Sequence, residues 1–76
     1  MNNSKANLLS SVAHESRYVT QIIHFKNGYR KTIYGIDTLS IEQGQFTKFH
    51  CKDGRYIMIH DKNVLMVEVF SEENDD

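Results

Sequence analysis

Residues 58–67 read MIHDKNVLMV, and this stretch gives the strongest indication of the fold. Two short apolar segments enclose a polar turn at residues 60–63. Apolar runs of this length with many β-branched residues are typical of strands, and a polar break between them is typical of a tight connection. The stretch therefore predicts the last two strands of a small β domain. Its turn carries an imidazole, a carboxylate and an amine on consecutive residues, His60, Asp61 and Lys62.

The sequence upstream of this stretch continues the same pattern as far back as residue 17. Val19, Gln21, Ile23 and Phe25 alternate with more polar neighbours, as in a half-buried strand. Glycines at positions 28, 44 and 54 follow polar residues and predict turns. We expect strands near residues 19–25, 29–39, 45–52, 55–59 and 65–70. A glycine inside the second strand, Gly35, predicts a bend or bulge.

The two ends of the chain differ from this middle part. In residues 1–16, Ser4 is a candidate N-cap for a short helix with an apolar stripe of Leu8, Leu9, Val12 and Ala13. Residues 71–76 hold four acids and no base, which predicts a solvated, disordered tail. The alternative is a regulatory tail that competes with nucleic acid. Without the tail, six acids face nine Lys and Arg, so the body is weakly basic.

Length and composition limit the class of protein. With 76 residues the chain forms one small domain that buries little surface, so self-association is a natural source of stability. The single Cys51 excludes an internal disulfide and a cysteine-based zinc site, which fits a reducing cytoplasm. No signal peptide or membrane-spanning run is visible, so we expect a cytoplasmic protein without a membrane partner.

The framework of residues 58–67 resembles the second signature of the Sm-like family, apolar-Arg-Gly-x-Asn-apolar-apolar-x-apolar. The matching positions are Ile59, Asn63, Val64, Leu65 and Val67, whereas His60 and Asp61 stand where the family has Arg-Gly. The first signature of the family is partly matched by Ile22, Ile23, Phe25, Asn27 and Gly28, with Asp37 near its later aspartate. Bacterial Hfq shows a similar pattern, and its Lys-His pair is loosely matched by His60 and Lys62. The resemblance covers about residues 5–70.

This resemblance implies an all-β fold, in which a short N-terminal helix precedes a five-stranded, strongly bent Sm-like (SH3-like) barrel over residues 17–70. It also implies a homo-oligomeric ring, in which the fourth strand of one subunit pairs with the fifth strand of its neighbour. The candidate interface residues are Ile57, Ile59, Met66, Val67 and Phe70.

The function implied by the resemblance is binding of single-stranded RNA around a central pore. The candidate RNA-binding residues are His60, Lys62 and Asn63 of the turn, and Asp37, Gln43 and Gln45 of the loop before the third strand. Phe46 is either a stacking residue beside this loop or, more simply, a core residue. Basic and tyrosine residues around Tyr29, Arg30 and Lys31 suit either an RNA surface or an ordinary solvated strand.

The sequence gives no reason to expect an enzyme, a cofactor or a metal site. The four histidines, at positions 14, 24, 50 and 60, lack the close pairing that marks zinc ligands. The alternative function is a homo-oligomeric scaffold that binds other proteins without binding RNA, for example a viral or mobile-element accessory protein.

Overall fold

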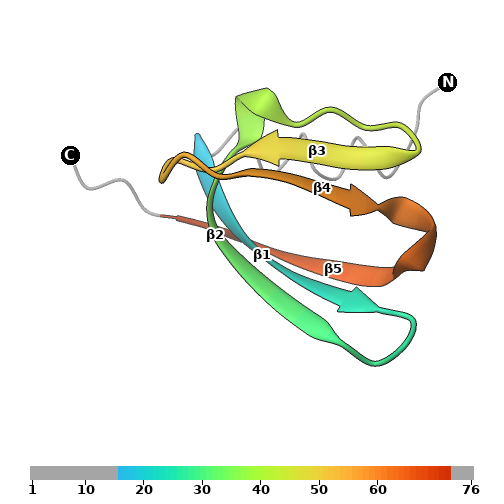
Figure 1. Ribbon diagram of the computed structural model, residues 1–76. Coiled ribbons are helices and arrows are strands. Elements are labelled where there is room, and N and C mark those ends of the chain that lie inside the picture. The colour runs from blue at the N-terminus through green and yellow to red at the C-terminus, as the bar shows by residue number, and fades with distance from the viewer. Residues whose placement is uncertain (1–15, 73–76) are drawn as a thin grey trace, which may run out of the picture.

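The computed structural model describes residues 16–72. The predicted N-terminal arm and helix therefore lie outside the described residues, apart from Ser16. Five strands follow in order: β1 (Tyr18–Phe25), β2 (Arg30–Asp37), β3 (Phe46–His50), β4 (Tyr56–His60) and β5 (Val64–Ser71). Two short 3₁₀ turns, η1 (Thr38–Ser40) and η2 (Asp61–Asn63), precede β3 and β5 (Figure 1). No helical segment within this part of the chain is long and apolar enough to cross a membrane.

The strands form two antiparallel sheets. One sheet has the order β2-β1-β5, and the other is the β3-β4 hairpin. The two sheets face each other in Figure 1, with β3 and β4 above β1, β2 and β5. The all-β prediction is therefore confirmed, and each predicted strand has a counterpart, although β3 is shorter than expected because residues 51–54 form the turn.

Gly35 bends β2 so that its end contacts the β3–β4 hairpin. The β1–β2 register shifts between Val19 and Gln21, and Gly35 has a φ of 68°, which residues with a side chain rarely adopt. Beyond this bend, Ile36 forms a bridge with Cys51, and the Lys52 N–H donates to the Gly35 carbonyl at 2.8 Å. The bend predicted at Gly35 is confirmed, and it turns the end of β2 towards β3.

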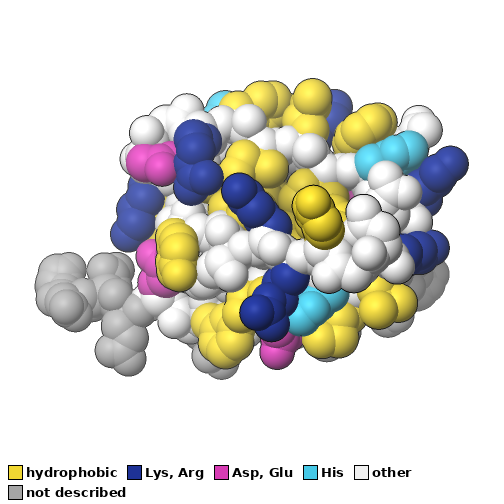
Figure 2. Space-filling view, turned by 60° about the horizontal axis from the view of Figure 1, so that its bottom comes forward, with side chains coloured by type: hydrophobic (Ala, Val, Ile, Leu, Met, Phe, Trp, Pro, Cys, Tyr) yellow, Lys and Arg dark blue, Asp and Glu magenta, His cyan; other side chains and the backbone are white. Residues whose placement is uncertain are grey.

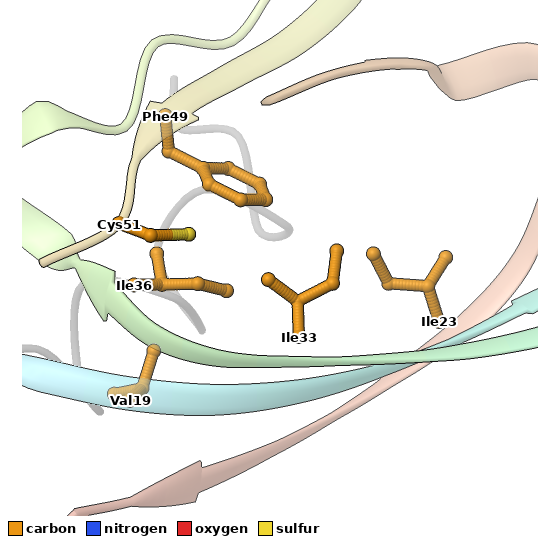
Figure 3. Close-up of a cluster of buried hydrophobic side chains, with 6 residues drawn as sticks. All are labelled: Val19, Ile23, Ile33, Ile36, Phe49 and Cys51. Atoms are coloured by element: carbon orange, nitrogen blue, oxygen red, sulfur yellow. The ribbon is translucent and has the colours of Figure 1, made fainter. Parts of the chain in front are cut away.

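The core lies between the two sheets. Its six buried hydrophobic side chains come from β1, β2, β3 and the residue that follows β3: Val19, Ile23, Ile33, Ile36, Phe49 and Cys51 (Figure 3). The alternation along β1 was predicted, and it places Val19 and Ile23 on the inner face. Burial raises the pKa of the Cys51 thiol, so this cysteine behaves as a small apolar core residue.

The outer strands β4 and β5 are not paired with each other. Within residues 16–72, β4 pairs only with β3, and β5 pairs only with β1. The described strands therefore do not close a barrel, and β4 and β5 each keep one edge that no described strand pairs with. Several large apolar side chains on these two strands are exposed: Tyr56, Met58, Leu65, Met66, Val67 and Phe70.

The end of β5 corrects part of the predicted tail. Ser71 belongs to β5, and the Glu72 carboxylate accepts hydrogen bonds from the Thr20 hydroxyl at 2.8 Å and from the Gly35 N–H at 2.7 Å. The Lys52 ammonium lies 3.4 Å from the same carboxylate. Of the six tail residues, Ser71 thus ends β5 and Glu72 is hydrogen-bonded to the sheet, and the other four lie outside the described residues.

Candidate nucleic-acid interface

The η2 turn is held against both neighbouring hairpins by main-chain hydrogen bonds. The Lys26 N–H donates to the Asn63 carbonyl at 2.9 Å, and the Asp61 N–H donates to the Gln45 carbonyl at 3.3 Å. The turn thus lies between the start of β3 and the β1–β2 hairpin. Three of the predicted site residues, His60, Lys62 and Asn63, come together here with the main chain of Gln45.

His60 stacks on Phe46 at the start of the β3–β4 hairpin. The two residues are cross-strand partners, their ring centroids are 4.7 Å apart, and their planes differ by 14°. Phe46 remains 38% exposed, so the simpler expectation that Phe46 is a core residue was wrong. Alternation explains its position, because Phe49 and Thr47 occupy the other face of β3. The result is an aromatic and imidazole pair at the surface beside the turn.

Asp61 is directed away from His60. Its two carboxylate oxygens accept from the Thr47 hydroxyl at 2.7 and 3.0 Å, and Thr47 lies on the opposite face of β3 from Phe46. The acid that follows His60 in sequence is therefore tied to a neutral hydroxyl. This arrangement leaves the exposed side of the Phe46–His60 pair free of the Asp61 charge.

Two amines lie near the turn. Lys62 is an exposed residue of η2, and Lys26 is exposed and hydrogen-bonded through its main chain to Asn63. Figure 2 shows one face of the molecule, where exposed hydrophobic side chains are interspersed with Lys and Arg side chains. Stacking groups next to cations are the combination that binds single-stranded nucleic acid in a sequence-tolerant way.

The loop between β2 and β3 contributes less than predicted. Asp37 is the last residue of β2 and lies near the His50 end of β3, whereas Phe46 lies at the other end. The Asp37 carboxylate accepts hydrogen bonds from the Arg17 guanidinium at 2.8 and 3.0 Å and from the Leu39 N–H at 3.0 Å. The hydrogen bonds from Arg17 hold the pKa of Asp37 below its ordinary value. Asp37 therefore caps η1 and is separated from His60. Gln43 and Gln45 are exposed, and Gln45 touches the turn through its main chain.

The candidate interface residues fall into two groups. Ile57 and Ile59 pack against the core of their own chain. Met66, Val67 and Phe70 are exposed on β5, and Leu65 beside them is 68% exposed. The free edge of β5 thus carries exposed apolar groups on both of its faces, because successive residues of a strand point to opposite sides.

The remaining histidines do not form a metal site in the described part of the chain. His24 contacts Glu68 at 2.8 Å on the three-stranded sheet, and His50 stacks on Tyr56 on the other sheet. Residues 16–72 contain no group of three His, Cys, Asp or Glu side chains that could hold a metal ion. Tyr29 and Arg30 line a hollow with His24 and Gly28 on the β1–β2 hairpin.

Comparison of the chain with models of protein families, with curated proteins and with solved structures finds no match.

Proposed function

We propose that this protein is a subunit of an Sm-like, homo-oligomeric ring that binds single-stranded RNA beside the η2 turn. The observation that carries the proposal is the exposed Phe46–His60 stack next to Lys62, on a chain whose two outer strands have free edges. The strongly bent five-stranded barrel of each subunit is part of this proposal. In the ring, β5 of a neighbouring subunit would pair with β4 and continue its sheet.

The free edges favour assembly with identical copies. An unpaired strand exposes main-chain N–H and C=O groups that readily pair with another chain. On β4, Met58 is 58% exposed, and on β5, Met66 and Phe70 are about half exposed. Pairing of β4 with β5 of the next subunit is a head-to-tail contact, which closes into a ring when the rotation between subunits permits it. Such a contact would satisfy both edges and cover exposed side chains of β5.

The η2 turn offers the groups that single-stranded RNA needs. A base can stack on the exposed surface of the Phe46–His60 pair, and the ammonium groups of Lys62 and Lys26 can attract the phosphates on either side. The imidazole of His60 replaces the arginine of the Sm-like signature as a flat, hydrogen-bonding group. Ring assembly would repeat this site once in every subunit. Cys51 is free and buried, which is compatible with action in the reducing cytoplasm.

A protein-interaction scaffold of viral or mobile-element type is the second candidate. The exposed apolar residues of β5, Leu65, Met66, Val67 and Phe70, favour it, because exposed apolar patches often mark protein contacts. The two functions differ in their dependence on salt. RNA binding through lysines weakens steeply as salt rises, whereas a mainly apolar contact does not.

The test is fluorescence anisotropy of a labelled oligo-U RNA, titrated with the full-length protein at several salt concentrations. We expect a linear fall of log K with log salt, and a smaller slope for Lys62→Ala by about 0.7 for each lost phosphate contact. His60→Ala should weaken binding about fivefold or more because it removes a stacking group. His24→Ala, on the other sheet, is the matched control and should bind as the unaltered protein does. Absence of RNA binding at low salt would reject the RNA function and leave the scaffold.

A further inference from the structure

A second aromatic and imidazole pair lies on the same face as the first. His50 stacks on Tyr56 with ring centroids 4.5 Å apart and planes that differ by 28°. Tyr56 is 52% exposed, and His50 is also exposed. The RNA site proposed above does not include this pair, which lies at the other end of the β3–β4 hairpin from the η2 turn.

The register of the hairpin places the two pairs in one row of side chains. Cross-strand partners point to the same side of a sheet, and so do residues two positions apart. The outward side of the hairpin, which we call the β3–β4 outer face, therefore consists of three partner pairs: Phe46 with His60, Lys48 with Met58, and His50 with Tyr56. The opposite side of the same hairpin carries Phe49, Ile57 and Ile59, which pack into the core.

The chemistry of this face suits a chain of bases joined by phosphates. Flat rings at both ends can stack on bases, and the Lys48 ammonium and the Met58 thioether lie between them. The two stacked pairs are four residues apart on β3, which corresponds to about 13 Å. A stacked single strand rises about 3.4 Å per nucleotide, so roughly four nucleotides span this distance.

Cationic residues flank the face at both ends of β4. Lys62 follows the end of β4, and Arg55 precedes its start. Arg55 is paired with Asp53 at 2.9 Å, and Glu42 is the bridge partner of Lys48, so the face is not strongly basic. On this face stacking would therefore contribute more than charge, whereas the lysines near the η2 turn give RNA binding its salt dependence. Lys48 at the centre of the face also favours a ligand with phosphates over an apolar protein surface.

We propose that the β3–β4 outer face is an extended binding platform for single-stranded RNA, on which the His50–Tyr56 pair holds a second base. This inference rests on the function proposed above, because the first base occupies the Phe46–His60 pair. Pairing of the β4 edge with a neighbouring subunit uses main-chain groups. Pairing of this edge therefore does not itself occupy the stacked rings.

The test compares full-length variants in anisotropy titrations with a labelled oligo-U of twelve nucleotides. Tyr56→Ala removes the second stacking ring, and we expect it to weaken binding about fivefold or more. Tyr56→Phe keeps the ring and should bind within about twofold of the unaltered protein. Tyr29→Ala removes an exposed tyrosine from the β1–β2 hairpin and should leave the affinity unchanged. Circular dichroism and native mass spectra should be the same for all variants, because Tyr56 and Tyr29 lie outside the core.

The outcomes separate this inference from the function on which it rests. If His60→Ala weakens binding but Tyr56→Ala does not, RNA binding stands and the platform is rejected. Equal losses for Tyr56→Ala and Tyr56→Phe would mean that the hydroxyl and not the ring matters, which also rejects a stacking platform. Equal losses for Tyr56→Ala and Tyr29→Ala would indicate a diffuse surface without a second subsite. If the unaltered protein binds no RNA, both proposals fall.

Discussion

Glu72 joins three strands at the end of the described chain, and its replacement by alanine should destabilise the protein. Its carboxylate accepts from the Thr20 hydroxyl of β1 and from the Gly35 N–H at the bend of β2, while Glu72 itself follows β5. The Lys52 ammonium adds an ion pair from the β3–β4 turn. The side chain of Glu72 is 23% exposed, so much of this network is shielded from water.

The size of the effect follows from these contacts. A hydrogen bond to a charged group contributes about 1.5–3 kcal/mol, and partial exposure of the site reduces this value. Loss of two such bonds and of one ion pair should lower the free energy of unfolding by about 2–3 kcal/mol. For a domain of this size, that corresponds to a fall in Tm of roughly 10–20 °C.

The effect should also depend on pH in a defined direction. Burial raises the pKa of the Glu72 carboxyl, but the bonds from Thr20 and Gly35 and the nearby Lys52 outweigh burial, so this pKa lies below its ordinary value in the folded protein. The folded state therefore keeps Glu72 ionised at lower pH than the unfolded chain does. The stabilisation is complete above the unfolded-state pKa of about 4.3 and is lost as the pH falls through the lower folded-state pKa.

The assay is urea unfolding of the unaltered protein and of Glu72→Ala, at one protein concentration because assembly also stabilises the fold. Glu68→Ala, on the same strand, is the control and should cost at most about 1 kcal/mol, since its partner His24 is in a partly exposed pair. At pH 7 the Glu72 variant should be clearly less stable, and the difference should shrink as the pH is lowered from about 5 to 3. A difference that is absent at pH 7, or that is unchanged at pH 3, would refute the reasoning.

Three further substitutions test the fold and the turn. Phe49→Ala removes the largest fully buried side chain and should lower the free energy of unfolding by about 3–5 kcal/mol in urea titrations; a change below about 1 kcal/mol would contradict the core assignment. Gly35→Ala should lower the free energy of unfolding by about 1–2 kcal/mol in the same titrations, because a residue with a side chain is strained at a φ of 68° and the added Cβ would lie 2.9 Å from Lys52 Cγ. Gly44→Ala is the control, because a Cβ added there meets no atom within 4 Å. Thr47→Val removes the hydroxyl that holds Asp61 and should weaken oligo-U binding in anisotropy titrations. Thr47→Ser keeps a hydroxyl and should bind as the unaltered protein does. If the valine variant also binds with unchanged affinity, the position of Asp61 is irrelevant to RNA binding.

The strands and the bend could be predicted because their signals are local. Alternation along residues 19–25 marks the inner face of β1, and a glycine within a strand marks a place where the chain departs from regular pairing. The tail assignment was less accurate for a physical reason. The composition of residues 71–76 predicts an acidic tail without distinguishing its members. In the structure, Glu72 accepts a hydrogen bond from the Gly35 N–H at the bend of β2, a contact that depends on the tertiary fold.

The candidate site was predicted in part. The resemblance pointed to His60 and Lys62, and the structure places both at the η2 turn. It also pointed to Asp37, which the structure ties to Arg17 and Leu39 at the other end of β3, because the loop register could not be fixed from sequence. The stacked pairs were missed because the length of the hairpin loop sets the register. A two-residue Asp53-Gly54 turn would pair Phe46 with Asp61, whereas the three-residue loop 52–54 of the structure pairs Phe46 with His60.

Native mass spectrometry of the full-length protein, alone and with oligo-U RNA, shows whether the chain forms a ring and whether that ring binds RNA. We expect one closed stoichiometry of more than two subunits that takes up RNA, since the unpaired edges of β4 and β5 and the Phe46–His60 stack are present in every copy. A ring that does not bind RNA would contradict the RNA function and favour the protein scaffold. A folded monomer at micromolar concentration would contradict the assembly itself.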